Sequence, residues 1–169
     1  MTAVGQVKRA VAAAIKAAGC AAIESYSEEQ LKRYATAVAA VGTKETVIEE
    51  SGAAQYLGEK VDEATQETVS VYGRKMLLTL LIEVYARRTL GAAGCEKAAE
   101  AVTQALMTAL PEGLKLGSLQ WGKTGWDKTT GMFRLDASAK YAAYFVAEAA
   151  EDETVFTDFV LKGTVKERE

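Results

Sequence analysis

The sequence predicts an α+β domain with a mixed, mostly antiparallel sheet and helices packed on one face. Three observations predict this class. Residues 76–82, inside the segment 69–88, form a nearly continuous apolar run, which is typical of a central strand covered on both faces. Apolar residues then recur every three or four positions over residues 95–110, which indicates a helix with one apolar stripe. Residues 133–145 alternate between apolar and polar, which favours a strand with one packed and one wet face.

The chain is expected to start with a helix, a short strand and a connecting helix. Residues 6–18 combine strong helix formers with an apolar stripe, and Gly19 stands where such a helix would end. Residues 21–25 favour a short strand. Ser27 and Gln30 then have the spacing of a capping box, which predicts a short helix directly after Ser27.

The next segment introduces the first long stretch of strand. Residues 35–50 are rich in valine, with Gly42 and Thr43 in the middle, and predict either a β-hairpin or one long bent strand. Residues 51–67 lose this pattern and gain glycines and acids, so a long exposed loop is expected there. Such loops often carry function, which makes this loop a candidate contact region.

Strands are expected again after the helix at residues 95–110. Pro111, the only proline, and Gly113 are expected to end that helix sharply. Three strands with two connecting turns follow in the prediction: strands at residues 114–121, 133–145 and 154–165, and turns at residues 122–131 and 148–153.

Length and composition fit one domain over residues 1–169. The expected parts are a helical part at 1–34, a sheet with its central helix at 35–165, and a frayed tail at 166–169. The net charge of −3 gives no overall attraction to nucleic acid or to an anionic membrane, so neither is expected as a partner. No apolar run reaches membrane-spanning length and no cleavable leader is evident, so we expect a soluble protein made inside the cell.

The residue inventory argues against catalysis. The chain has no histidine, which removes serine–histidine and cysteine–histidine pairs and histidine-bearing zinc sites. Cys20 and Cys95 are expected to be small buried thiols. The carboxylate pairs Glu49-Glu50 and Asp62-Glu63 could hold a divalent ion, but acids in a loop are more often simply solvated. We therefore expect no catalytic residues, no metal and no cofactor, and hence no enzyme.

Charge is distributed unevenly along the chain. Residues 45–67 hold seven acids and one base, a local charge of −6, whereas residues 115–140 hold five bases and two acids, a local charge of +3. Opposite signs on separate segments suit head-to-tail self-association, although the alternative is a solvated surface whose charges never meet. Trp126 could likewise stack on a nucleic-acid base, pack internally or lie at a protein interface. The interface candidates are Glu59, Asp62, Glu63, Arg87, Arg88, Lys123, Trp126 and Lys128.

Several short runs carry a family resemblance. They are Tyr56-Leu57-Gly58-Glu59, Tyr72-Gly73-Arg74 opening a strand that ends at Tyr85, Gly131-Met132-Phe133-Arg134-Leu135, and Phe156-Thr157-Asp158-Phe159-Val160. Over residues 35–163 the chain resembles small tail proteins encoded by prophages of Gram-positive bacteria. The order of its elements is similar to tail terminator, or tail completion, proteins of long-tailed phages and tailocins. The resemblance implies an α+β subunit that forms a ring, typically a hexamer, with no catalytic residues.

The expected function follows from this resemblance. Such a ring closes the upper end of the tail tube, stops its polymerisation and presents a surface to the head connector or the sheath. The expected partners are therefore other copies of the chain, the tail tube protein, and the sheath or connector protein, within a virion or tail particle assembled in the bacterial cytoplasm. The alternatives are a tube, connector or baseplate component, or a small-ligand-binding or enzymatic domain with a pocket beside Trp121 and Tyr141.

Overall fold

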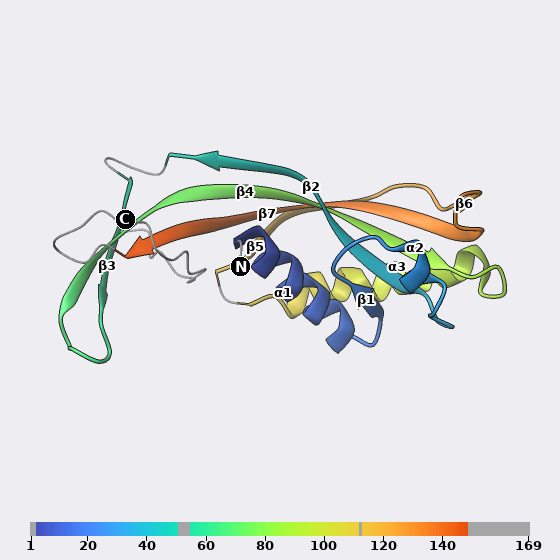
Figure 1. Cartoon of the computed structure of the whole chain (residues 1–169), viewed down its shortest axis with the longest axis horizontal. Helices are drawn as coiled ribbons and strands as arrows, with labels where there is room; N and C mark the ends of the chain where they lie inside the picture. The colour runs from blue at the N-terminus through green and yellow to red at the C-terminus, as the bar shows by residue number, and fades with distance from the viewer. Residues whose placement is uncertain (1–2, 51–54, 112, 149–169) are drawn as a thin grey trace.

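A computed structural model describes residues 3–50, 55–111 and 113–148. Within these residues three helices accompany one seven-stranded, mostly antiparallel sheet, which confirms the predicted α+β class (Figure 1). The elements are α1 (Ala3–Ala17), β1 (Ala21–Ile23), α2 (Glu28–Leu31), β2 (Val38–Glu49), β3 (Tyr56–Val61), β4 (Thr68–Ala86), α3 (Gly91–Thr108), β5 (Lys115–Trp121), β6 (Gly125–Asp127) and β7 (Met132–Glu148).

The sheet is built around β4, its longest strand. The strand order is β1-β2-β4-β7-β5; β3 pairs with β4 beyond the end of β2, and β6 pairs with the start of β7. Among the described pairs only β1 and β2 run parallel. The 19 residues of β4 span about 60 Å at roughly 3.3 Å per residue, so the sheet is long and narrow.

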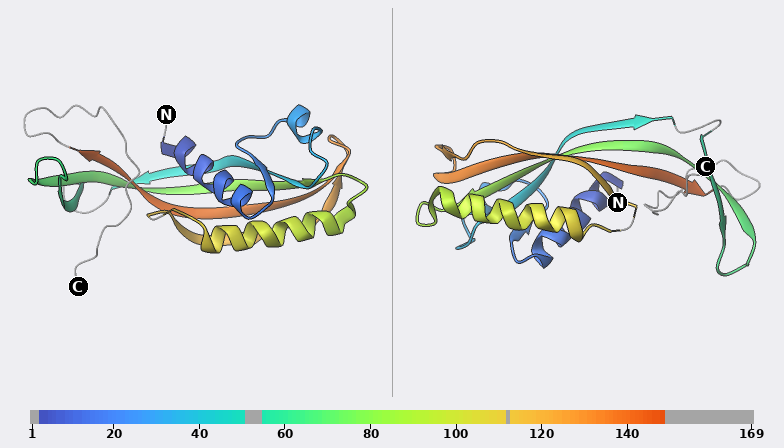
Figure 2. Two further views of the ribbon diagram at one scale, coloured as in Figure 1. Left: turned by 90° about the horizontal axis from the view of Figure 1, so that it is seen from below. Right: turned by 180° about the vertical axis from the view of Figure 1, so that it is seen from behind.

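The main core lies between the sheet and the helices α1 and α3, which cross the same face of the sheet (Figure 2). Alternate residues of β4 point into this core, and the two helices contribute residues at three- and four-residue spacing. These residues are Met76, Leu78, Leu80, Ile82 and Val84 of β4, Val7, Val11 and Ile15 of α1, and Cys95, Ala99, Val102 and Leu106 of α3.

The opposite face of the sheet is covered at one end only. Leu31 of α2 packs there with Val38, Tyr85 and Met132, and the strand register places these residues on the face away from the main core. β4 is therefore buried on both faces only near its C-terminal end. The prediction that the whole segment 69–88 is covered on both sides is wrong, because the four-residue helix α2 is too short to cover more of the sheet.

The first half of β4 belongs to a projecting hairpin, which we call the arm (residues 55–75). Residues 56–61 form β3 and pair with residues 68–72 of β4, with a β-bulge between Tyr56 and Gly58. The prediction of a loop over residues 51–67 is therefore wrong for β3; residues 51–54 lie outside the described part of the chain. The arm extends beyond the helices (Figure 1), so helix α1 and helix α3 do not cover it.

The remaining local predictions are largely confirmed. α1 ends before Gly19, whose φ is +85°, and the Ser27 hydroxyl accepts a hydrogen bond from the Gln30 N–H at 3.4 Å. Residues 38–49 form one long strand with an irregularity between Thr43 and Glu45 rather than a hairpin. α3 begins at Gly91, four residues earlier than expected, and the expected turn at residues 122–131 contains the short strand β6. The predictions for residues 149–169 fall outside the described residues.

Replacing Leu80 by alanine tests the one-sided core. Leu80 is fully buried against the helices, so Leu80→Ala should lower the free energy of unfolding by about 2–5 kcal/mol. Leu77 lies on the same strand but on the other, open face and is only half-buried, so Leu77→Ala should cost clearly less. Urea unfolding of both variants measures the difference. Equal losses would contradict the one-sided core.

Candidate assembly surfaces

The tip of the arm is acidic. Residues 59–67 hold four acids (Glu59, Asp62, Glu63 and Glu67) and one base, Lys60, a net charge of −3. We call this segment the acidic tip. The side chains of Glu59, Glu63 and Glu67 are exposed. The acidic tip therefore presents several carboxylates to solvent at the far end of the hairpin.

Asp62 also shapes the turn that connects β3 and β4. Its Oδ1 accepts hydrogen bonds from the backbone N–H groups of Ala64 at 2.7 Å and Thr65 at 3.1 Å. Its own N–H donates to the Glu67 carbonyl at 2.9 Å. This is the local side-chain turn that aspartate commonly forms, so Asp62 positions the acidic tip as well as contributing charge to it.

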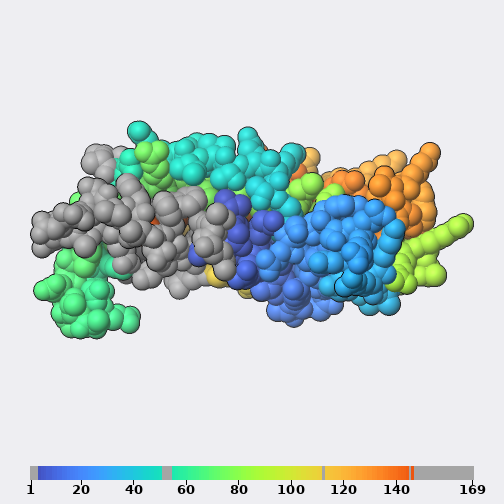
Figure 3. Space-filling view, in the orientation of Figure 1, coloured from blue at the N-terminus to red at the C-terminus, as the bar shows by residue number. Residues whose placement is uncertain are grey.

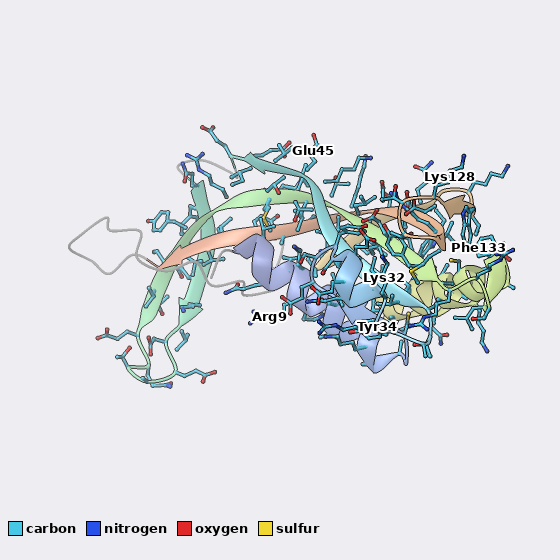
Figure 4. The ribbon with its side chains drawn as sticks, turned by 45° about the vertical axis from the view of Figure 1, so that its right-hand side comes forward. Arg9, Lys32, Tyr34, Glu45, Lys128 and Phe133 are labelled. Carbon is cyan, nitrogen blue, oxygen red and sulfur yellow. The ribbon has the colours of Figure 1, made fainter. Side chains whose placement is uncertain are left out.

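The opposite end of the sheet is basic. Arg87 and Arg88 follow the last residue of β4, and Lys123 and Lys128 flank β6. We call these four residues, together with Leu90 and Trp126, the basic end. All four basic side chains are exposed. Figure 4 shows Lys128 and Phe133 together in this part of the molecule, where β6, β7 and the end of β4 meet.

Local contacts hold the basic end in place. The Arg87 guanidinium donates a hydrogen bond to the Lys32 carbonyl at 2.6 Å. The Asp127 carboxylate accepts hydrogen bonds from the Thr130 hydroxyl at 2.7 Å and the Thr129 N–H at 3.1 Å, and the first of these is the main reason why its pKa is lowered. Asp127 is thus tied into the β6–β7 turn, while the neighbouring lysines remain exposed.

The eight residues predicted as interface candidates fall into two groups at opposite ends of β4. Glu59, Asp62 and Glu63 belong to the acidic tip, and Arg87, Arg88, Lys123, Trp126 and Lys128 belong to the basic end. Figure 3 shows the tip of the arm in green and the β6 region in orange at the two extremes of the surface. The two groups therefore do not meet within one chain, and contact between them across two copies stays a prediction.

A cluster of charges on the α2 side of the sheet was not predicted. Glu83 and Asp136 are cross-strand partners, and Arg134 binds both: its NH2 lies 2.7 Å from Glu83 Oε1 and its Nε lies 2.6 Å from Asp136 Oδ1. The Tyr85 hydroxyl donates to Glu83 Oε1 at 3.2 Å. The hydrogen bond to Asp136 is the main reason why the pKa of Arg134 is raised. Because Arg134 is held between two carboxylates, this cluster is built to stabilise the sheet rather than to bind an anion.

The groove beside Trp121 does not have the form expected of an enclosed ligand site. Trp121 Nε1 donates to the Thr103 hydroxyl at 2.9 Å at the edge of a groove of about 490 Å³ that is open to solvent. The carboxylate that lines the groove, Glu100, is exposed, and Tyr141 is not among the lining residues. The groove is lined by Ala99, Glu100, Thr103, Gln104, Met107, Thr108 and Trp121.

Residues 117–124 contain the letters of a phosphate-binding motif. Gly117, Gly122, Lys123 and Thr124 have the spacing of the phosphate-loop motif G-x-x-x-x-G-K-[ST], which requires a strand, a loop and then a helix. In the structure Gly117 lies within β5, the Gly122 N–H donates to the Asp136 carbonyl at 2.7 Å, and the next element is the strand β6. The backbone is therefore committed to the sheet and cannot wrap around a phosphate.

The two cysteines are buried, and the carboxylates of the described residues do not gather into a metal-binding group. Cys20 and Cys95 are free and buried, and burial raises the pKa of Cys95 to about 11. Among the residues that the structure describes, no group of three His, Cys, Asp or Glu side chains could hold a metal ion. The described helices also include none with the length and apolar character needed to cross a membrane.

No family model and no curated protein matches the chain.

Replacing Arg134 by methionine tests the charge cluster. Arg134→Met leaves the carboxylates of Glu83 and Asp136 facing each other without their cation, and Glu83 is only 9% exposed. The Arg134 side chain is 36% exposed, so solvent weakens its interactions. The free energy of unfolding should therefore fall by about 1–3 kcal/mol.

The matched control for this variant is Arg33→Met. Arg33 forms an ion pair with Glu29 at 2.7 Å, but both side chains are more than two-thirds exposed, so almost no loss is expected. Urea unfolding measures both variants. A loss for Arg134→Met no larger than the loss for Arg33→Met would contradict the role given to the cluster.

Proposed function

We propose that the chain is a structural assembly subunit: a ring-forming tail terminator that caps the tail tube of a phage or tailocin and joins it to a head connector or sheath. The observation that carries this proposal is the placement of the acidic tip and the basic end at opposite ends of one strand. Two different complementary patches on one molecule make a heterologous contact, and such contacts close into a ring when the rotation between copies permits it.

The stiffness of the sheet supports this proposal. β7 pairs with residues 71–86 of β4 on one side, while β2 and then β3 pair with β4 on the other side. Residues 71–86 of β4 are thereby held between two neighbouring strands, and the acidic tip extends beyond them on β3 and β4 alone. A fixed geometry of the paired strands favours one type of assembly over a mixture, and this assembly is a closed ring when the rotation between copies permits closure.

The named partners in this proposal are other copies of the chain, the tail tube protein, and the sheath or connector protein. A tube subunit, a head–tail connector and a baseplate component are the alternatives within the same class of structural proteins. The length of the polymer separates these possibilities, because a tube protein stacks without limit whereas a terminator stops at one ring. Negative-stain electron microscopy of the purified protein, alone and mixed with tail tubes, makes this test.

The expected image is a closed ring, with hexamers as the expected order, seated at one end of each tube. Open filaments of the purified chain would indicate a tube protein instead. A chain that stays monomeric at every concentration, both alone and in the presence of tubes, would overturn the proposal.

Charge reversal at the acidic tip should weaken self-association. Glu59→Lys combined with Glu63→Lys replaces two attractive charges by repulsive ones, and the apparent Kd between copies should rise roughly tenfold or more at low salt. High salt should shrink the difference, because it screens exposed charges. Sedimentation velocity at two salt concentrations measures both effects.

The matched control carries the same change in net charge elsewhere. Glu45→Lys combined with Glu100→Lys alters one exposed acid of β2, which pairs with Thr79 in the middle of β4, and one exposed acid of α3, and should leave association unchanged. Combining the tip variant with a chain that carries Arg88→Glu and Lys128→Glu should restore association between the two variants. If the tip variant assembles like the unmodified chain with the same salt dependence, the charged contact is refuted.

A further inference from the structure

We infer that the arm carries an apolar patch that docks on the basic end of a second copy of this chain, around Trp126. This inference rests on the proposed self-assembly and names the surface that makes it. Four side chains form what we call the arm patch: Tyr56, Val61 and Tyr72 of the arm, and Ile48 of the neighbouring strand β2. Their exposed fractions are 50%, 44%, 57% and 37%, which are large values for such side chains.

The strand register places the arm patch on one face of the sheet. Tyr56 pairs with Tyr72, Val61 pairs with Thr68, and Ile48 pairs with Met76. Because side chains alternate along a strand, residues 68, 72 and 76 of β4 share a face. That face is the one that α1 and α3 cover further along the sheet. The arm patch is therefore the continuation of the core-facing surface beyond the described helices.

The arm patch is also preorganised. The rings of Tyr56 and Tyr72 lie 5.7 Å apart between centroids in an edge-to-face arrangement. Such aromatic pairs are already fixed in the free molecule, so little side-chain freedom is lost when a partner covers them. The acidic tip continues from the patch along the same hairpin, which gives the arm an apolar part and a negatively charged part.

The basic end has the matching composition. Trp126 is 45% exposed and its ring packs edge-to-face on Phe133, with 5.1 Å between centroids. Leu90 is 39% exposed, and Arg87, Arg88, Lys123 and Lys128 are exposed as well. Apolar side chains accompanied by charges of the opposite sign are the usual anatomy of a specific interface, and a fixed tryptophan is a frequent energetic centre.

Charge favours the basic end over the groove beside Trp121, which also exposes an apolar side chain. The groove beside Trp121 includes Met107, which is 73% exposed, but its lining contains Glu100 and no basic side chain. An acidic arm would be repelled there and attracted at the basic end. The arm cannot reach the basic end of its own chain, because β4 separates the two, so the occupant is a second copy.

Cross-linking between two different variants tests this contact directly. A Val61→Cys chain is mixed with a Leu90→Cys chain and treated with a short bismaleimide; the native thiols of Cys20 and Cys95 are buried. The expected product is a covalent dimer that contains one chain of each kind, formed in the mixture and not by either variant alone. A Met107→Cys chain replaces the Leu90→Cys chain as the matched control. Capture of Val61→Cys by Met107→Cys in preference to Leu90→Cys, or no mixed product with either, would overturn the inference.

Substitutions measure how much the patch contributes. Tyr72→Ser and Trp126→Ser should each raise the apparent Kd for self-association roughly tenfold or more, and the effect should persist at high salt because the contact is apolar. Tyr26→Ser changes a tyrosine of similar exposure, 46%, on the α2 side of the sheet and should leave the Kd unchanged. Urea unfolding confirms that each variant is folded. Unchanged association of both Tyr72→Ser and Trp126→Ser would refute the docking.

Two outcomes separate this inference from the proposed function. If the unmodified chain associates through the arm and the basic end but never seats on a tail tube, the terminator function is wrong and the docking stands. If rings form on tubes equally well with Tyr72→Ser and Trp126→Ser, the function stands and the docking is wrong.

Discussion

The pairing of β4 on both of its sides is the constraint on which the rest of the structure depends. A strand of 19 residues leaves two long rows of backbone donors and acceptors, and most of them are satisfied only because β7 lies on one side and β2 with β3 on the other. The sheet must therefore be about as long as β4. The helices are shorter than the sheet, so the core covers one part of it and the arm is left beyond the core.

The elements with strong periodicity could be predicted from the sequence, and those held by non-local pairing could not. Residues 133–145 show their strand because burial of one face imposes a period of two on the side chains, whereas residues 76–82 show theirs as a nearly continuous apolar run. β3 shows no such period, since Gly58 and Glu59 interrupt its apolar residues and its stability comes from pairing with β4. The cluster of Glu83, Arg134 and Asp136 was missed for a related reason, because only the register of β4 and β7, two strands far apart in the sequence, brings these side chains together.

The candidate surfaces, too, could be predicted from the sequence only in part. The signs of charge at residues 45–67 and 115–140 could be read from the sequence, but the distance between the two groups depends on the length and register of the sheet. Sequence reasoning named Trp126 but not Leu90, nor the tyrosines of the arm as a patch, because their exposure follows from where the helices end. The phosphate-loop spacing at Gly117 shows the converse: a full match of letters has no chemical meaning when the backbone is part of a sheet.

The separation of the two ends determines which contacts between copies are favourable. At physiological ionic strength the Debye length is about 8 Å, whereas the acidic tip and the basic end lie on the order of 60 Å apart along β4, so they do not neutralise each other within one molecule. Two tips repel, two basic ends repel, and only the head-to-tail arrangement brings opposite charges together. Charge alone gives a weak and salt-sensitive contact, since exposed ion pairs contribute little. In the proposed contact the apolar side chains at both ends supply the part that salt does not screen, and the twist of the sheet fixes the angle between the ends. Whether head-to-tail contacts close into a ring or continue as a filament is then decided by that angle.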